Sequence, residues 1–224
     1  MGYNWDYLNK EGYNNNTGHY RSKIELDFIG KNIQNKKYKI LDIAGGSGRI
    51  SIPLLKYADN ITVTDINADA LRILDERKLG IRTVAGDFEK TEFKDKFSLV
   101  LCIEGPDYFH DWNNLFQKIS SLLEKDGKFI FTYTNPDSWR YRARKLKQAG
   151  KADPYYSPNF IQLKELLERF NFEFEDIKGF NWTLFPVRSN SIFVHLFTFL
   201  EKILMLGKWH SQSPWLIISV KKRN

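Results

Sequence analysis

The sequence predicts an α/β fold: a doubly wound, mostly parallel seven-stranded sheet with helices on both faces, an N-terminal helical lid and an insertion after strand five. Two observations lead to this prediction. From residue 38 onward, short apolar runs typical of buried strands alternate with segments of helical periodicity, and this alternation favours right-handed crossovers and a parallel sheet. The first apolar run ends in a cluster of glycines, which a tight strand-to-helix turn requires.

The elements follow from local patterns taken in chain order. Residues 1–20 are expected to form a flexible arm or short helices, and apolar residues at helical spacing predict the first helix over 22–33. Pro53 is tolerated near the first turn of its helix, and Asn67 or Asp69 caps the helix that follows. We expect strands at 38–44, 60–64, 81–85, 97–103, 128–134, 172–179 and 215–221, and helices at 22–33, 48–57, 68–77, 113–123, 137–150, 159–170 and 192–206.

The glycine-rich turn is Asp42-Ile43-Ala44-Gly45-Gly46-Ser47-Gly48. A dinucleotide-binding oxidoreductase would need a third glycine where this chain has Ser51. An acid at position 42 would also repel a pyrophosphate, whereas it would attract a cofactor that carries a sulfonium and an ammonium group. The turn therefore favours a cationic cofactor.

Acidic residues recur at the ends of the next three predicted strands. Asp65 ends the second strand, where a carboxylate can accept both hydroxyls of a ribose. Asp87, followed by Phe88, ends the third strand, and Ile103 and Glu104 follow the fourth. Since parallel strands end at the same edge of a sheet, these residues are expected to surround one ligand site.

Together these motifs, over residues 38–134, resemble the class I (Rossmann-like) S-adenosylmethionine-dependent methyltransferases. The segment from Cys102 to Asp111 and the stretch 123–129 resemble the small-molecule branch that includes quinone-biosynthesis and sugar methyltransferases. The resemblance implies S-adenosyl-L-methionine as cofactor and no metal. It also implies a single methyltransferase domain over 1–224, with a lid at 1–35, a cofactor-binding core at 36–135 and a substrate-side insertion with the C-terminal strands at 136–224.

The resemblance also implies roles for individual residues. Ala44 replaces the usual first glycine of the motif, and we expect binding to survive with a shifted loop. The residues implied in cofactor binding are Asp42, Ala44, Gly45, Gly46 and Gly48 beside the methionine part, Asp65 at the ribose, Ile66, Asp87 and Phe88 at the adenine, and Ile103 and Glu104 over the methionine end.

Catalysis and the lid leave alternatives open. A base after strand four would be Asp107, Tyr108 or His110, although His110 is better explained as a surface-loop histidine beside Asp111. Tyr20 and Arg21, with Tyr13, would form a lid in which Arg21 reaches the cofactor carboxylate, or they begin a surface helix.

Two later segments are ambiguous in the same way. The basic stretch 140–151, with Arg140, Arg142 and Arg144, is either a solvated helix face or a site for an anionic acceptor. The apolar helix 192–206 packs on the sheet or a partner subunit, or it contacts an apolar acceptor or a membrane surface, with Trp182, Phe185 and Trp209 lining the same pocket.

The function predicted from these features is methyl transfer to a small-molecule acceptor, anionic or apolar, at oxygen, nitrogen or carbon. The net charge of +7 leaves a nucleic-acid (tRNA or rRNA) methyltransferase open as an alternative. A catalytically weak methyltransferase-like binding protein is a further alternative. A single cysteine, Cys102, suits the cytoplasm. No transmembrane segment is expected, peripheral membrane contact is allowed, and the protein is expected to be a monomer or homodimer.

Overall fold

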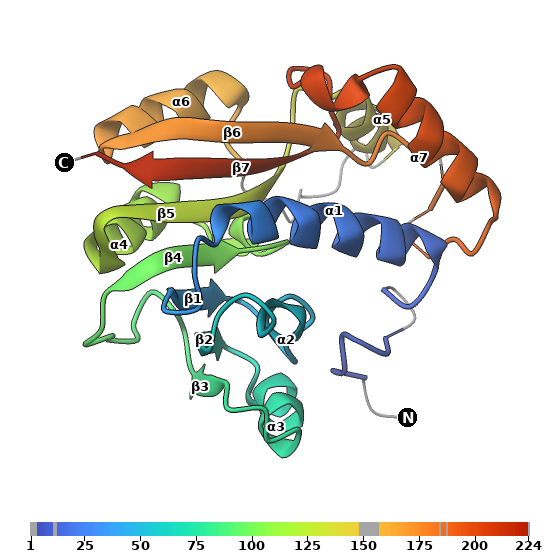
Figure 1. The fold of residues 1–224 in the computed structure, drawn as a ribbon. Coiled ribbons are helices and arrows are strands. Elements are labelled where there is room, and N and C mark those ends of the chain that lie inside the picture. Colours follow the sequence, from blue (N-terminus) through green and yellow to red (C-terminus); the bar gives the residue numbers. More distant parts are fainter. Residues whose placement is uncertain (1–3, 11–12, 148–156, 184, 187, 224) are drawn as a thin grey trace.

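The computed structural model describes residues 4–10, 13–147, 157–183, 185–186 and 188–223. Its centre is one seven-stranded sheet in the order β3-β2-β1-β4-β5-β7-β6 (Figure 1). All neighbouring strands are parallel except β7, which runs antiparallel to both β5 and β6. The predicted mostly parallel α/β sheet is therefore confirmed. The strands are β1 (Lys39–Ile43), β2 (Asn60–Asp65), β3 (Arg82–Ala85), β4 (Phe97–Cys102), β5 (Leu123–Thr134), β6 (Phe172–Phe180) and β7 (Trp215–Lys222).

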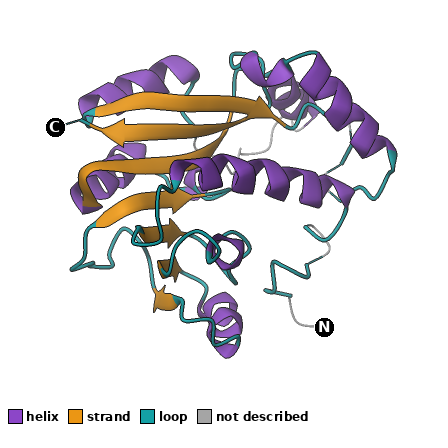
Figure 2. Ribbon diagram, in the orientation of Figure 1, coloured by secondary structure: helices purple, strands orange, loops and turns teal. Residues whose placement is uncertain are grey.

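Helices cover both faces of this sheet (Figure 2). One apolar core joins the sheet to α4 and α6, and a second joins its other face to α1, α2 and α3. Because these five helices turn apolar side chains toward the sheet, the two cores together bury both faces. The helices are α1 (Asn16–Asn32), α2 (Ser51–Leu54), α3 (Ala68–Glu76), α4 (Trp112–Leu122), α5 (Trp139–Lys147), α6 (Phe160–Arg169) and α7 (Phe193–Ile203), with 3₁₀ turns at Pro106–Tyr108 and Leu206–Lys208.

Three boundaries differ from the prediction for identifiable reasons. The first helix begins at Asn16 and not at 22, because the side chain of Asn15 accepts a hydrogen bond from the Gly18 N–H and caps it. The helix expected over 48–57 is reduced to the four residues of α2, with Pro53 inside its single turn. Strand β5 starts at Leu123 rather than 128, and Asp126 (φ 60°) lies within an irregularity between the pairs Phe97–Leu123 and Leu99–Lys128.

The topology places the ends of β1, β2, β3 and β4 at one edge of the sheet. Strands β2 and β3 lie on one side of β1, whereas β4 and β5 lie on its other side. The crossovers therefore change direction between β1 and β4. A reversal of strand order opens a crevice beyond the carboxyl ends of such a sheet. Residues at those ends are therefore the candidates for ligand binding.

Candidate cofactor and active site

A cavity of about 620 Å³ lies beyond the carboxyl ends of β1 to β4. This volume is in the range of sites that hold a cofactor or small ligand. Most of the residues proposed from the sequence do line it. They are Asp42, Ala44, Gly45, Asp65, Ile66, Asp87, Phe88, Ile103, Glu104 and Tyr108.

The turn after β1 takes a backbone path that glycine favours. Ala44, Gly46 and Gly48 have φ values of 56°, 53° and 88°. A Cβ at position 48 would lie 2.8 Å from Leu74 Cδ1, so Gly48 lets the turn pack against α3. Ala44 adopts the left-handed conformation in spite of its methyl group, at a cost of about 1 kcal/mol.

Asp65 is held rigidly at the end of β2. Its Oδ2 accepts the Gly46 N–H at 2.9 Å and its Oδ1 accepts the Asn67 N–H at 2.8 Å. A carboxylate has about four lone-pair positions, so two remain for the hydroxyls of a ribose in the cavity. This donor and acceptor set fits an adenosine-containing cofactor.

Asp42 is fully buried beneath the turn and accepts the Ser51 hydroxyl proton at 2.5 Å. Burial raises the pKa of Asp42 to about 6, and the nearby Asp65 charge adds to the rise. Ser51 stands where a dinucleotide-binding motif would have glycine, and its hydroxyl partly offsets that cost. Asp42 therefore carries a carboxylate that a neighbouring cation would stabilise.

Asp87 and Phe88 form the side of the cavity beyond β3. The Asp87 Oδ1 accepts the Glu89 N–H at 3.0 Å, which fixes the carboxylate after the strand. The Phe88 ring is nearly buried and meets Phe109 edge to face, with ring centroids 6.2 Å apart. The pair offers a hydrogen-bond acceptor beside an apolar surface, as a purine ring requires.

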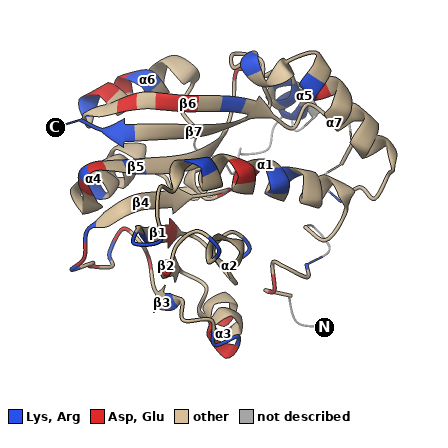
Figure 3. Cartoon of the chain, in the orientation of Figure 1, with Lys and Arg blue, Asp and Glu red and all other residues tan. Residues whose placement is uncertain are grey.

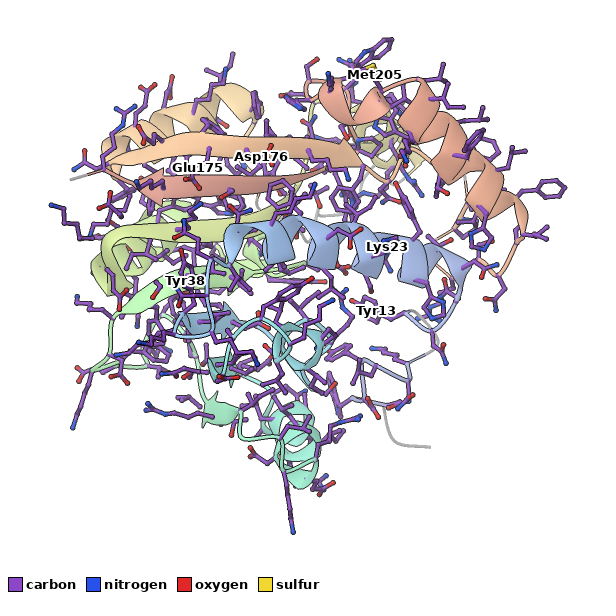
Figure 4. All side chains as sticks on the ribbon, in the orientation of Figure 1. Tyr13, Lys23, Tyr38, Glu175, Asp176 and Met205 are labelled. Carbon is purple, nitrogen blue, oxygen red and sulfur yellow. The ribbon has the colours of Figure 1, made fainter. Side chains whose placement is uncertain are left out.

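A buried group of charged side chains, here called the α1 charge cluster, lies between α1 and the cavity: Tyr13, Arg21, Glu25, Arg49 and Glu104. The Arg49 guanidinium contacts Glu25 Oε2 at 2.6 Å and Glu104 Oε1 at 3.2 Å. Arg21 contacts the same Glu104 oxygen at 3.3 Å, and the Tyr13 hydroxyl donates to Glu104 Oε2 at 2.9 Å. Tyr13 lies just below α1 in Figure 4. Two arginines and two glutamates thus share one buried network at the cavity wall.

The two glutamates of the α1 charge cluster titrate in opposite directions. Burial raises the pKa of Glu25 to about 7, and the attraction of Arg49 offsets this only in part. Burial also acts to raise the pKa of Glu104, but Arg21 and Arg49 outweigh it and lower that pKa. Glu104 is therefore the ionised partner of both arginines near neutral pH.

The sequence reasoning missed Glu25 and Arg49. The available signals were weak: Glu25 interrupts the apolar residues Ile24 and Leu26 of a helix, and Arg49 directly follows the glycine turn. Neither position shows that the two side chains meet, because their contact depends on how α1 crosses the sheet.

The N-terminal segment covers the mouth of the cavity. The Tyr7 N–H donates to Ser47 Oγ at 2.7 Å, and Asp6 pairs with Arg77 at 2.9 Å. Trp5, Tyr7, Lys10 and Tyr13 all line the cavity. The lid expected over 1–35 includes all four residues, and Tyr13 was named in it. No motif indicated that Trp5, Tyr7 and Lys10 would line the cavity.

The structure directs two expected lid residues away from the cavity. The Tyr20 hydroxyl donates to Glu201 and accepts the Asn181 N–H at 3.0 Å, so it connects α1 to the C-terminal part. Arg21 is 2% exposed within the α1 charge cluster and does not line the cavity. Its guanidinium acts on the site through Glu104.

Of the three candidate bases, only Tyr108 reaches the cavity. It is 63% exposed at the mouth. Asp107 is buried and accepts the Ser157 hydroxyl proton at 2.5 Å, so it fixes the chain that enters α6. His110 is exposed in the loop before α4 and is not part of the cavity wall.

The two ambiguous C-terminal segments also take definite positions. Arg140 is not a solvated residue, because it donates to the carbonyl oxygens of Asn181, Thr183 and Phe185 at 2.7 to 3.1 Å. Residues 148–151 of the basic stretch lie outside the described residues. Of the alternatives left open for helix 192–206, packing of its whole apolar surface on the sheet does not occur, since most of the apolar side chains on α7 are exposed. Trp209 is 61% exposed and does not line the cavity.

The described residues contain no group of three or more His, Cys, Asp or Glu side chains that could hold a metal ion. They also contain no helix with the length and apolar content needed to cross a membrane.

The sheet order, the glycine turn and the acids around the cavity define a Rossmann-like enzyme that binds an adenosine-containing cofactor. The family described as "Methyltransferase domain" matches residues 16–177, so the chain belongs to that family. It is a methyltransferase that depends on S-adenosyl-L-methionine, as the resemblance in its sequence implied.

The chain is also similar to named proteins and, in its fold, to a solved structure. The chain is 26% identical over 231 residues to glycine/sarcosine N-methyltransferase of Aphanothece halophytica, covering 92% of this chain and 84% of that protein. It is 28% identical to malonyl-[acyl-carrier protein] O-methyltransferase 1 of Ilyobacter polytropus, covering 70% of this chain but only 59% of that protein. Magnesium protoporphyrin IX methyltransferase of Synechocystis, solved with bound SAH, has the same fold with a TM-score of 0.67, 11% identity and 92% and 84% of the two chains covered.

Proposed function

We propose that the enzyme transfers the methyl group of S-adenosyl-L-methionine to a small-molecule acceptor that binds at the mouth of the cavity, between the N-terminal segment and Tyr108. Three aromatic side chains, of Trp5, Tyr7 and Tyr13, and the cation of Lys10 line this mouth. Aromatic walls with few charged groups suit a compact organic acceptor. The names of the relatives describe methylation of glycine or sarcosine and of malonyl-[acyl-carrier protein], and they support the same proposal.

The observation that carries the proposal is the Asp65 carboxylate. Two backbone N–H groups fix it at the end of β2 beside Ile66, and its remaining lone pairs line the cavity. We assign the ribose hydroxyls to Asp65 and the adenine to Asp87, Phe88 and Ile66. The methionine end lies beside Asp42, the turn from Ala44 to Gly48, and the segment Ile103–Glu104.

When bound, the cofactor would supply a methyl group on a cationic sulfur: the acceptor would form its new bond to the methyl carbon while the carbon–sulfur bond breaks and the neutral thioether S-adenosylhomocysteine leaves. The residues of the chain position the reactants and exclude water. The ionised Asp42 and Glu104 offer negative charge near the methionine end of the cofactor, and Arg49 offers a cation to the carboxylate of that methionine part. Tyr108 is the side chain proposed to contact the acceptor, since Asp107 is held by Ser157.

The nucleic-acid alternative gains no support from the comparisons. The arrangement of charge agrees with this, because exposed acidic and basic residues lie together on α1 and α3 (Figure 3), and on α1 Lys23 pairs with Asp27. On α3, for example, Arg72 pairs with both Asp69 and Glu76. Such a surface neutralises itself and does not present a continuous track of cations to a phosphate backbone.

Calorimetric titration with S-adenosyl-L-methionine tests the assignment of the site. We expect the wild type to bind and Asp65→Ala to bind on the order of 100-fold more weakly, because it loses two hydrogen bonds from a charged acceptor. Asp69→Ala is the matched control: it removes the same charge four positions away, where the side chain is 66% exposed, and leaves the affinity unchanged. Equal affinity of wild type and Asp65→Ala would show that the ribose lies elsewhere.

The acceptor is identified separately. Incubation with the cofactor and amine, carboxylic acid or phenol acceptors, followed by mass spectrometry for an added methyl group, shows which class reacts. A Tyr108→Ala variant should raise the KM for the acceptor and leave the affinity for the cofactor as it was. A variant with the wild-type acceptor KM would remove Tyr108 from the acceptor site.

A further inference from the structure

The outer side of α7 and the turn after it carry an unusual concentration of exposed apolar side chains, here called the α7 face. Phe193 is 59% exposed, Phe199 57% and Trp209 61%. Most of the large exposed hydrophobic residues of the described chain fall between positions 192 and 209. The α7 face consists of Ile192, Phe193, Leu196, Phe199, Leu200, Ile203, Leu204, Met205 and Trp209.

The helix is fixed to the body of the protein by its other side. Val194 and Glu201, seven positions apart, are buried. The Glu201 Oε1 accepts the Trp182 N–H at 2.7 Å and its Oε2 accepts the Tyr20 hydroxyl proton. Because the inward contacts are satisfied in this way, the apolar stripe faces outward in the folded chain and is not an unpacked part of the core.

The spacing of the stripe is that of an amphipathic helix lying on a surface. Phe193, Leu196, Leu200 and Ile203 follow one another at intervals of three and four residues, so they project from one side of the helix. The eleven residues of α7 are far fewer than the ~20 that cross a bilayer. A helix of this kind lies in the plane of an interface.

Within the segment that forms the α7 face, the exposed charges are all positive. Between residues 188 and 213 the only carboxylate is Glu201, which is buried, whereas Arg188, Lys202 and Lys208 are exposed. The basic helix α5 adjoins this region, since Arg142 donates to Gln212 Oε1 at 3.2 Å. Figure 3 shows Lys and Arg on α5 beside the largely uncharged ribbon of α7.

Leu146 on α5 extends the same pattern. It is 81% exposed between Lys145 and Lys147, and the described part of α5 holds no carboxylate. An apolar stripe bordered by cations is complementary to a surface that is apolar inside and negatively charged at its edge. A second copy of this chain would instead bring lysines toward lysines, with no exposed carboxylate on the face to pair them.

We propose that the α7 face docks on an anionic lipid bilayer. The aromatic and aliphatic side chains enter the boundary between headgroups and acyl chains, and Lys202, Lys208 and the exposed Arg142 and Lys145 of α5 contact the headgroups. In Figure 1, α7 and α5 lie toward the end of the sheet at which the β4 arrow points, the end that holds the cavity. The docking holds independently of which acceptor is methylated.

Cosedimentation of the full chain with phosphatidylcholine vesicles, with and without phosphatidylglycerol, tests the proposal. We expect binding to the anionic vesicles that weakens as salt is raised. Phe193→Ser with Phe199→Ser should lower the affinity about tenfold or more. Lys202→Gln and Lys208→Gln should each lower it about fivefold.

Matched controls separate the α7 face from general surface properties. Ile161→Ser on α6, where the side chain is 71% exposed, and Lys36→Gln, where it is 61% exposed, should bind as the wild type does. All variants should keep the wild-type circular dichroism spectrum and cofactor affinity, because the altered side chains face solvent.

Three results would overturn the proposal: no binding of the wild type to anionic vesicles, binding that the phenylalanine double variant and both lysine variants leave unchanged, or equal binding to neutral and anionic vesicles. Sedimentation velocity provides the remaining outcome. A dimer that Phe193→Ser with Phe199→Ser disperses, together with no vesicle binding, would assign the α7 face to a second copy of the chain.

Discussion

Around the cofactor cavity the chain buries charged groups, whereas along α7 it leaves large apolar side chains in solvent. Glu25 is 0% exposed and Arg21 2%, while Phe193 and Phe199 on α7 are more than half exposed. Each region reverses the ordinary distribution, in which charges face water and large apolar groups are buried. Figure 4 places the two regions apart, with Tyr13 below α1 and Met205 beyond the far end of α7.

The two reversals differ in what they cost the folded protein. A buried charge loses its hydration, so the α1 charge cluster is stable only while every charge keeps its partner. An exposed apolar side chain forfeits the stabilisation of burial but leaves nothing unsatisfied, so α7 tolerates substitution. The residues of the cofactor site therefore depend on one another for stability. The residues of the α7 face are not needed for folding, and exposed apolar patches of this kind mark interaction surfaces.

Arg49→Met gives the largest expected effect. It leaves Glu25 without its 2.6 Å partner and removes one of the two cations at Glu104. Loss of one partner from a buried ion pair costs about 3–5 kcal/mol. Urea denaturation at pH 7.5 measures the free energy of unfolding, and we expect a fall of this size.

Arg72→Met is the control for the loss of an arginine as such. Arg72 is 64% exposed and pairs with Asp69 and Glu76 on the surface of α3. Exposed pairs of this kind contribute at most about 0.5–1 kcal/mol. If both variants lost the same small amount, the α1 charge cluster would not be the buried network that its distances describe.

Glu25→Gln should have an effect that depends on pH. Burial raises the pKa of Glu25 from 4.5 to about 7, against the attraction of Arg49 and with a contribution from Glu104. Between these pH values the folded state keeps a proton that the unfolded state has released. The stability from this group is therefore fully present below about pH 4.5 and is lost as the pH rises through about 7.

Glutamine lacks this titration, so the sign of the difference is fixed. Relative to wild type, Glu25→Gln should be more destabilising at pH 5 than at pH 8, by up to about 3 kcal/mol. Paired urea titrations at the two pH values measure it, with Glu76→Gln on the exposed face of α3 as the control. A difference of the opposite sign would mean that Glu25 stays ionised and Arg49 dominates its environment.

The same contrast explains what the sequence could and could not predict. Asp65 and Asp87 were placed correctly at the cavity because parallel strands end at one edge of a sheet, whatever their side chains do. Arg49 and Glu25 escaped prediction because their contact needs the crossing of α1 over the glycine turn, which no local pattern encodes. Asp107 was a reasonable candidate base, but the hydroxyl of Ser157, fifty positions later in the chain, donates a hydrogen bond to its carboxylate and holds it in place.

The α7 segment shows a different limit. Its apolar spacing predicted a helix correctly, yet the same spacing fits a helix packed on a sheet and a helix facing an interface. Glu201 determines which side of α7 faces the protein, because its bonds to Tyr20 and the Trp182 N–H hold that side inward and leave the apolar side chains exposed. That choice depends on partners distant in the sequence, so periodicity alone could not make it.

Ala44→Gly has the smallest expected effect and tests whether the site stores backbone strain as well as buried charge. Ala44 lies at φ 56°, in the region where a Cβ costs about 1–2 kcal/mol. Glycine removes that cost but loses about 0.4–1 kcal/mol because the unfolded chain becomes more flexible. We therefore expect the free energy of unfolding to rise by up to about 1 kcal/mol, and a fall would show that the methyl group packs against Gly105 well enough to offset the strain. Because the change leaves Asp65 and its two backbone donors in place, calorimetry should give unchanged or tighter cofactor binding, which would separate strain in the turn from the charges that surround it.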